Sequence, residues 1–304
     1  MSLNSRAAYW KSLSTKVIGH RGSGMNRDAS GGSNLQVGEN TVLSFITAAN
    51  LGAEYVEFDV QLTSDLTPVI YHDWTVTETG IDVPIHSLTK DQLREELNEE
   101  LEKVLTHKKV PKKVKGNNAE TIQAPFTTLA ETFRQVPAHV GFNIEVKYPM
   151  KCEAQDAAVW SHVELNRFVD SILKVVYDLA GDRDVIFSSF HPDICLMLNV
   201  KQPSYPVFFL TDGGYYPYVD ARCNSLQEAV RFAKHAGLLG IVSVSTLILQ
   251  APILAPAIKN QGLLLFTYGV LNNSVPCVQL QKQLEVDAVI VDSVMAVRKG
   301  LQDP

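Results

Sequence analysis

Short apolar runs recur along this chain, and most of them are followed by a segment with helical periodicity. Each run has the length and composition of a buried strand. Strands that alternate with helices indicate a parallel sheet covered by helices. Nine runs predict strands, at Val17–His20, Val56–Val60, Val69–Tyr71, Phe142–Val146, Val185–Ser188, Val207–Leu210, Ile241–Val244, Leu264–Tyr268 and Ala288–Val291.

The second and third runs must form an antiparallel hairpin. Only residues 61–68 separate them, whereas a crossover between parallel strands needs about a dozen residues or more. A turn near Asp65–Leu66 would pair residues whose numbers sum to about 131, which sets His72 opposite Asp59. The other eight strands predict an α/β fold of the closed (β/α)8 barrel type, also called a TIM barrel.

Residues 74–122 contain no clear strand–helix unit. Their number is close to the excess of this 304-residue chain over a barrel of about 250 residues. Six acidic residues are followed there by six lysines, a pattern more typical of a solvated helix and loop than of a docking patch. The sequence therefore predicts one domain, 1–304, with an insertion at 74–122.

Charge and composition exclude several classes of protein. A net charge of −6 argues against nucleic acid or an anionic membrane surface as the main partner. The four cysteines lie far apart without a C-x-x-C pair, which favours reduced thiols in a cytoplasmic protein. The uncharged stretch Ala236–Ile258 is interrupted by Pro252 and Pro256, so we expect no stable membrane insertion.

Two carboxylates alternate with apolar residues in the second run. Period two sends Glu57 and Asp59 to the inside of the barrel, where ionised carboxylates are unfavourable without a cation. Glu145 and Lys147 repeat the pattern in a later strand. Three acids from two strand ends suit Mg²⁺ or Ca²⁺ rather than zinc. The alternative is a structural network around Glu145 and Lys147.

Two histidines and two cations complete this set of polar residues. His20 and His72 stand at strand ends, and two imidazoles near neutral pH suit general acid–base catalysis. One such histidine alone is more often structural, but the hairpin brings His72 toward Asp59. Arg21 offers a bidentate fork for a phosphoryl group, and Lys147 adds a point charge.

Taken in order, these motifs resemble the glycerophosphodiester phosphodiesterase family, and in particular its fungal-type cytosolic glycerophosphocholine phosphodiesterases. Any one motif is weak, whereas the ordered set is specific. The motifs are His20-Arg21-Gly22, Glu39-Asn40-Thr41, Glu57-x-Asp59, Thr63-x-Asp65 with Pro68-Val69, His72-Asp73, Glu145-x-Lys147, Ser189-Phe190 and Val291-Asp292. In the fungal proteins the corresponding domain ends a longer chain, so we expect an excised catalytic domain.

The resemblance implies a metal-dependent hydrolysis of glycerophosphodiesters, above all glycerophosphocholine, to sn-glycerol 3-phosphate and choline. The roles that it implies are acid–base catalysis by His20 and His72, metal ligation by Glu57, Asp59 and Glu145, phosphate binding by Arg21 and Lys147, and lining of the pocket by Glu39 and Asn40. The chain departs from many relatives at Gly38, where they have proline, and in a longer loop before it, which bears on substrate access.

The choline group is expected at the mouth of the barrel, held by aromatic faces rather than by a carboxylate. The candidates follow strand ends and are Trp74, Tyr148, Phe190 and Tyr268. Packing of a loop is the plainer explanation for any single one of them.

Two other functions stay open. One is a phospholipase-D-like hydrolysis of lysophospholipids, and the other is a phosphodiester-sensing module without turnover. The sequence also leaves open whether one or two ions bind, whether water or the glycerol 2-hydroxyl attacks, and which oligomeric state the protein adopts.

Overall fold

Eight parallel strands close into a barrel, because β1 pairs with both β2 and β12. The computed structural model describes residues 15–25, 37–76, 83–95, 126–151 and 163–302. Around the barrel the strands are β1 (Lys16–Gly19), β2 (Tyr55–Leu62), β7 (Gly141–Val146), β8 (Val185–Ser189), β9 (Val207–Thr211), β10 (Gly240–Val244), β11 (Leu264–Tyr268) and β12 (Ala288–Val291). The predicted barrel is confirmed.

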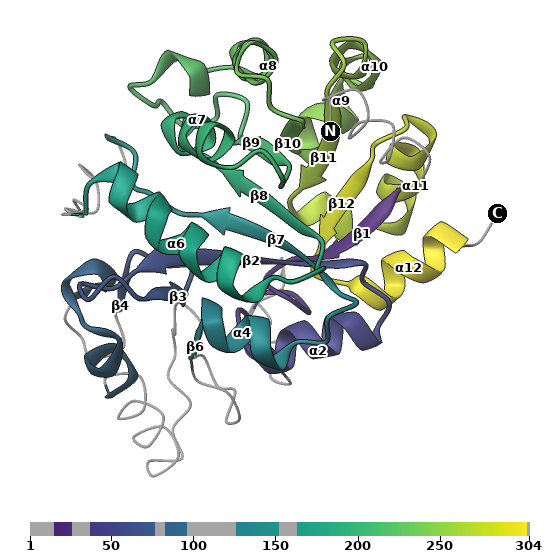
Figure 1. Cartoon of the computed structure of the whole chain (residues 1–304). Coiled ribbons are helices and arrows are strands. Elements are labelled where there is room, and N and C mark those ends of the chain that lie inside the picture. The colour runs from purple at the N-terminus through teal and green to yellow at the C-terminus, as the bar shows by residue number, and fades with distance from the viewer. Residues whose placement is uncertain (1–14, 26–36, 77–82, 96–125, 152–162, 303–304) are drawn as a thin grey trace.

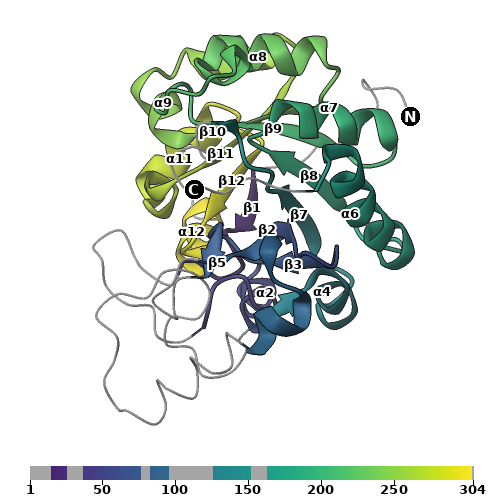
Figure 2. The same cartoon turned by 90° about the vertical axis from the view of Figure 1, so that its left-hand side faces the viewer.

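Helices surround the strands on all sides (Figures 1 and 2). They are α2 (Val42–Asn50), α4 (Leu129–Gln135), α6 (Leu165–Leu179), α7 (Pro192–Lys201), α8 (Leu226–His235), α9 (Ser245–Gln250), α10 (Leu254–Lys259), α11 (Val275–Gln283) and α12 (Val294–Gln302). Short 3-10 turns are η1 (Ile85–Ser87), η2 (Ala221–Cys223) and η3 (Val270–Asn273). Within the described ranges, no helix combines the length and the apolar character that crossing a membrane requires.

The core has two apolar layers, one on each face of the barrel wall. Between strands and helices, the ring of Phe58 lies 5.2 Å from that of Phe45 and 5.0 Å from that of Phe142. Inside the barrel, Phe208 and Phe266 stack with ring centroids 4.3 Å apart. Each fully buried phenylalanine contributes about 1.5–3 kcal/mol. This interior packing fills the barrel, so polar groups gather at its mouth.

The hairpin is present, but the predicted register is wrong by one residue. Strand β3 (Pro68–Ile70) pairs antiparallel with β2, with Val60 opposite Ile70. The Tyr71 N–H donates to the carbonyl of Asp59 (3.0 Å), so Tyr71 rather than His72 lies opposite Asp59. The cause is a three-residue loop centred on Asp65, with Leu66 in the left-handed region at φ 61°.

Only parts of the predicted insertion lie among the described residues. Strand β4 (Thr75–Val76) pairs with β5 (Val83–Pro84), and residues 90–95 are helical. Strand β6 (Thr127–Thr128) joins the outer edge of β3 and leads into α4. The predicted lysine-rich stretch, and most of the long loop before Gly38, lie outside the described residues.

Two helix ends are stabilised by the residues that stand there in the sequence. The side chains of Thr128 and Glu131 make the full capping box at the start of α4. Gly52 follows α2 with φ 96°, as a residue that ends a helix in the left-handed conformation. The N-cap of α2 is Thr41, whose hydroxyl accepts from the Ser44 N–H, and this leaves the side chain of Asn40 available for the barrel mouth.

Candidate active site

Three carboxylates converge at the mouth of the barrel. Glu57 and Asp59 lie on β2 and Glu145 on β7, and the register sets Asp59 beside Glu145. One oxygen from each of the three lies within 4.8 Å of the others. Glu57 is 4% exposed and Asp59 only 1%. The structure thus brings together the three residues that the sequence singled out as metal ligands.

The charges of these carboxylates are unevenly stabilised. Burial and the nearby Asp59 raise the pKa of Glu57 to about 8. Burial also raises the pKa of Glu145 to about 7, with Asp59 adding to the effect and Lys147 opposing it. Burial opposes ionisation of Asp59 too, yet His72, Lys147 and Arg21 hold its pKa well below the usual range. Ionisation of all three at neutral pH is therefore unfavourable, and a bound cation would favour it.

A hard divalent cation fits this donor set. All three ligands are carboxylate oxygens, the type that Mg²⁺ and Ca²⁺ prefer. Asn143, which lies opposite Glu57 in the register, has a buried Nδ2 with no acceptor among the described residues. A donor is thus in place beside Glu57 for the ionised form of that carboxylate, the form in which it could hold an ion.

Arg21 and Lys147 flank the carboxylates. Arg21 Nη1 donates to Glu39 Oε1 (2.8 Å), and its Nε lies 3.5 Å from Asp59 Oδ2. That Nε is buried and has no hydrogen-bond acceptor in the described part of the chain. Lys147 Nζ lies 3.5 Å from Asp59 and 3.7 Å from Glu145. An unsatisfied guanidinium donor beside a lysine suits a phosphoryl oxygen.

Both predicted pocket residues, Glu39 and Asn40, lie at the site and are buried. Glu39 holds the guanidinium of Arg21, as described above. Asn40 Nδ2 donates to Asp59 Oδ2 (2.9 Å), and its backbone N–H donates to the carbonyl of Arg21 (2.9 Å). These two residues therefore fix the positions of a candidate phosphate ligand and a candidate metal ligand.

The turn after β1 explains why the motif reads His-Arg-Gly. Arg21 adopts a left-handed conformation at φ 48°, and its N–H donates to Glu57 Oε2 (2.9 Å). Gly22 follows at φ 92°, and a Cβ there would come within 2.4 Å of Ser44 Oγ on α2. Only glycine fits this approach, which presses the turn against α2 and aims Arg21 at the carboxylates.

Each histidine has its own carboxylate partner. His20 Nδ1 lies 2.9 Å from Asp292 Oδ1, and His72 Nδ1 lies 2.7 Å from Asp73 Oδ1. Asp292 is held by Asn273 Nδ2 (2.7 Å). With Nδ1 engaged, Nε2 is the remaining ring nitrogen of each histidine. Asp73 and Asp292 belong to the His72-Asp73 and Val291-Asp292 motifs, and the sequence alone did not indicate that they pair with the histidines.

The surroundings of the two histidines shift their pKa values in opposite directions. Burial and Arg21 lower the pKa of His20, but the hydrogen bond that its ring donates to Asp292 and the negative charges of Asp292 and Glu57 outweigh them, so the net shift is upward. Burial, Arg21 and Lys147 lower the pKa of His72. Near neutral pH the arrangement therefore favours a protonated His20 and a neutral His72.

The four aromatic candidates occupy different places. Lys147 Nζ lies 5.0 Å from the centre of the Trp74 ring. The rings of Phe190 and Tyr268 meet edge to face, 6.0 Å apart, against the apolar layer inside the barrel. Tyr148 is apart from them, because its hydroxyl donates to the carbonyl of Val163 and its ring packs on Phe168 of α6. Tyr148 lies in the outer layer.

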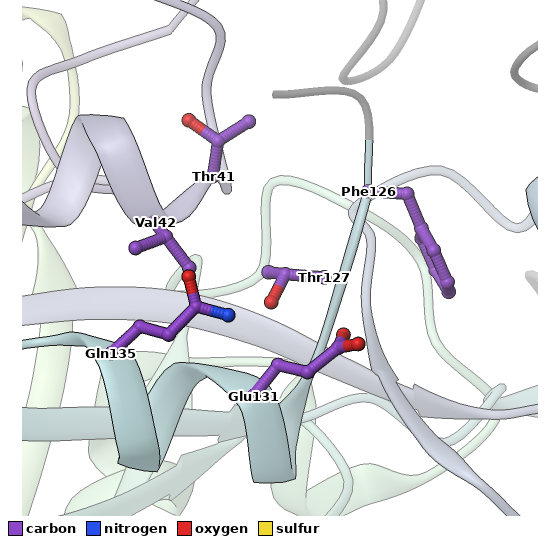
Figure 3. A pocket seen from close by; sticks show the side chains of 6 residues that line it. All are labelled: Thr41, Val42, Phe126, Thr127, Glu131 and Gln135. Atoms are coloured by element: carbon purple, nitrogen blue, oxygen red, sulfur yellow. The ribbon is translucent and has the colours of Figure 1, made fainter. Parts of the chain in front are cut away.

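A separate pocket lies between α2 and α4 (Figure 3). It has a volume of about 150 Å³. Its lining residues are Thr41, Val42, Phe126, Thr127, Glu131 and Gln135. None of them is a predicted site residue, and we assign this pocket no role.

Comparison with known proteins identifies the same family that the motifs resemble. The model of the Glycerophosphoryl diester phosphodiesterase family matches residues 20–296. The glycerophosphocholine phosphodiesterases GDE1 of Candida albicans and Schizosaccharomyces pombe are 47% and 42% identical, over 100% and 96% of this chain. The chain spans only 30% and 28% of their lengths. Glycerophosphodiester phosphodiesterase GDPD3 of Arabidopsis thaliana is 38% identical, over 94% of this chain and 77% of the relative.

Solved structures share the fold. A glycerophosphodiester phosphodiesterase from Thermotoga maritima superposes with a TM-score of 0.63 at 22% identity, over 94% of this chain and 98% of that one. A phosphodiesterase from Oleispira antarctica, solved with the product sn-glycerol-3-phosphate, has a TM-score of 0.68 at 19% identity, over 97% and 99%.

Proposed function

Because the chain belongs to the glycerophosphoryl diester phosphodiesterase family, we propose that it hydrolyses glycerophosphodiesters to sn-glycerol 3-phosphate and a free alcohol. The family predicted from the motifs, and the likeness to its fungal members, are thereby confirmed. The observation that carries the proposed reaction is the cluster of three buried carboxylates beside two cations and two carboxylate-paired histidines.

Glycerophosphocholine is the proposed substrate. The support is the name of the fungal relatives, which are 42–47% identical and match nearly all of this chain. The charges at the site also suit an anionic phosphodiester. A divalent ion would offset two of the three carboxylate charges, and Arg21 and Lys147 add two positive charges beside the cluster.

The two histidines would move the protons of the reaction. We assign His72, which the neighbouring cations favour as neutral, to remove the proton from the nucleophile. His20, which Asp292 favours as protonated, would donate a proton to the leaving alcohol oxygen. Asp73 and Asp292 would orient the rings through Nδ1. Water and the glycerol 2-hydroxyl are both compatible with this division of roles.

Glu57, Asp59 and Glu145 would hold the ion, which we propose to be Mg²⁺ or Ca²⁺. When bound, the ion supplies stabilisation of negative charge on the phosphoryl oxygens. Arg21 and Lys147 would bind the same group from the other side, and Glu39 would keep Arg21 from swinging away. A cytoplasmic location is also proposed, supported by Cys195, Cys223 and Cys277, which are free thiols.

The test is a product assay on metal-stripped protein. Glycerophosphocholine, glycerophosphoinositol and lysophosphatidylcholine are each offered with EDTA, Mg²⁺ or Ca²⁺, and choline or inositol release and sn-glycerol 3-phosphate are measured. We expect metal-dependent turnover of glycerophosphocholine. Turnover of the lysophospholipid alone would replace the proposal by the phospholipase-D-like activity, and binding without any turnover would replace it by a sensing module.

A further inference from the structure

One half of the barrel mouth takes no part in the proposed hydrolysis. It is formed by the ends of β8, β9, β10 and β11, which lie side by side in the upper half of Figure 2, whereas β2 and β3 lie in the lower half. Thr211 pairs in register with Ser243, and Val244 pairs with Tyr268. Asp212 directly follows Thr211, the last residue of β9, and so comes one residue beyond the Thr211–Ser243 pair.

Asp212 is a buried carboxylate that faces the inside of the barrel. Phe208 and Leu210 on the same strand belong to the interior apolar layer, and alternation gives Asp212 the same direction. The residue is 6% exposed. Its Oδ1 accepts from the Gly214 N–H (2.8 Å) and its Oδ2 from the Tyr216 N–H (3.1 Å), which shapes the loop that follows.

No cation among the described residues neutralises Asp212. Arg222, which lies further along the same loop, pairs instead with Asp193 and Asp220. A buried carboxylate without a cationic partner is a favourable neighbour for a cationic ligand. The charge on Asp212 therefore has no counterpart in the described part of the protein.

Aromatic residues lie near this carboxylate. Burial and then the nearby charges of Asp212 and Glu145 raise the pKa of the Tyr268 phenol. Phe190 meets the Tyr268 ring edge to face at 6.0 Å. Tyr216 belongs to the loop that Asp212 shapes, and its side chain is 64% exposed. It lies close enough to the Tyr268 phenol to add to the rise of its pKa.

We propose that this half of the mouth is a subsite for a quaternary ammonium group, the cationic end of a choline ester. The inference rests on the proposed function, because the phosphate at the metal cluster would hold the diester in place. The subsite consists of three aromatic residues and one carboxylate, namely Phe190, Tyr216, Tyr268 and Asp212.

The chemistry of the four subsite residues favours a quaternary ammonium group over other head groups. A quaternary ammonium has no hydrogen-bond donor, and aromatic faces with a nearby negative charge attract it. Both carboxylate oxygens of Asp212 already accept backbone hydrogen bonds, so a hydroxyl-rich group such as inositol would find few partners on these rings. The carboxylate departs from the expectation that aromatics alone would recognise choline.

A binding experiment tests the subsite without turnover. Wild-type protein is titrated calorimetrically with choline and with 3,3-dimethylbutan-1-ol, its uncharged isostere. We expect choline to bind more tightly by about tenfold, and Asp212→Asn to remove that difference, a change equivalent to about 1.4 kcal/mol. Equal binding of the two compounds, or an unchanged preference in Asp212→Asn, would refute the subsite.

A kinetic experiment separates recognition from structural damage. In Asp212→Asn the KM for glycerophosphocholine should rise by about tenfold, with kcat within about twofold and the KM for glycerophosphoglycerol unchanged. Asp220→Asn is the matched control, because it removes the same charge from the same loop where Arg222 pairs with it. An equal rise of KM for both substrates would mean a structural role and would overturn the inference.

A second variant covers the case in which Asp212→Asn does not fold. Tyr216→Ala alters an exposed side chain and should raise the KM for glycerophosphocholine alone, whereas no selective change would count against the subsite. Failure of the proposed function looks different. If neither diester is hydrolysed but the choline preference depends on Asp212, the hydrolysis is wrong and the subsite stands.

Discussion

The two halves of the barrel mouth are built on different principles. Around β1, β2 and β7, most charged side chains lie beside an opposite charge, and Arg21 and Asn40, which take part in these contacts, both adopt left-handed conformations. Around β8 to β11, rings pack edge to face, and the carboxylate of Asp212 has no cationic partner among the residues that the structure describes. The difference teaches that dense opposite charges fix the positions of the side chains in the first half. A carboxylate without a cationic partner in the described residues leaves the second half able to select a ligand by its charge.

We call the half of the mouth that carries Glu57, Asp59 and Glu145 the charged half. Loss of either histidine should have the largest effect on activity, because both histidines belong to this half. His20→Ala and His72→Ala should each lower kcat/KM by at least about 10²-fold. In the wild type, the opposite pKa shifts predict a bell-shaped pH profile. Its acid limb should lie below the usual histidine pKa, from His72, and its alkaline limb above it, from His20. A variant that keeps near-full rate would exclude the two-histidine division of roles.

Metal removal should make the charged half a source of instability. The folded-state pKa values of Glu57 and Glu145, about 8 and 7, lie above those of an unfolded chain. Raised values stabilise the fold at low pH, and this contribution is lost as the pH rises. EDTA-treated protein should therefore melt at least about 2 °C lower at pH 8.5 than at pH 5, and Mg²⁺ or Ca²⁺ should restore Tm mainly at the higher pH.

The variant Glu145→Gln distinguishes the destabilising charge of Glu145 in the metal-free protein from its role as a metal ligand. It should flatten the decline of Tm with pH in the EDTA-treated protein, while lowering metal affinity and activity together. Asp178→Asn, which removes an exposed carboxylate paired with Lys174, should change neither property. Normal turnover with an unchanged metal requirement in Glu145→Gln would remove Glu145 from the metal site.

Trp74 tests whether an aromatic residue in the charged half acts on phosphate rather than on the head group. Its ring lies 5.0 Å from Lys147 Nζ, so its loss should loosen that cation. Trp74→Leu should raise KM by about threefold to tenfold, and equally for glycerophosphocholine and glycerophosphoglycerol. A rise of KM for glycerophosphocholine alone would mean that Trp74 contacts the head group, and this would contradict the separation of the two halves of the barrel mouth.

Tyr148 should show the smallest effect, because it belongs to neither half. Tyr148→Phe removes one hydrogen bond to the carbonyl of Val163, worth about 1 kcal/mol, so Tm should fall by about 2–4 °C. Steady-state kinetics should give wild-type KM values for both diesters. A raised KM would contradict the outward orientation of the side chain.

Much of this arrangement could be predicted from local patterns. All nine predicted strands form, and they were recognised as short apolar runs, whereas the short strands β4, β5 and β6 were not predicted. The convergence of Glu57, Asp59 and Glu145 follows from the alternation of apolar and polar residues once a barrel is assumed. The hairpin register could not be predicted, because it depends on whether a loop of two or three residues forms, and Leu66 gives no sign of its left-handed conformation. One residue of slip changes the partner of Asp59.

The positions of Tyr148 and Asp212 could have been predicted from strand alternation, but attention to the motifs led away from them. Tyr148 follows inward-facing Lys147, so strict alternation already sends it outward, although its place after a strand drew attention to it. Asp212 continues the inward series of Phe208 and Leu210, but it lies beyond the apolar run and in no motif. Asp73 and Asp292 are in motifs, yet their pairing with the histidines depends on tertiary closure.

That closure has a consequence for how the protein is made. His20 and its partner Asp292 are 272 residues apart, and β1 can pair with β12 only when β12 has been synthesised. At ribosomal rates of about 5–20 residues per second, His20 waits about 14–54 s for its carboxylate. A nascent chain that stops before β12 can carry the metal ligands and both cations, but it lacks one of the two histidine–aspartate pairs.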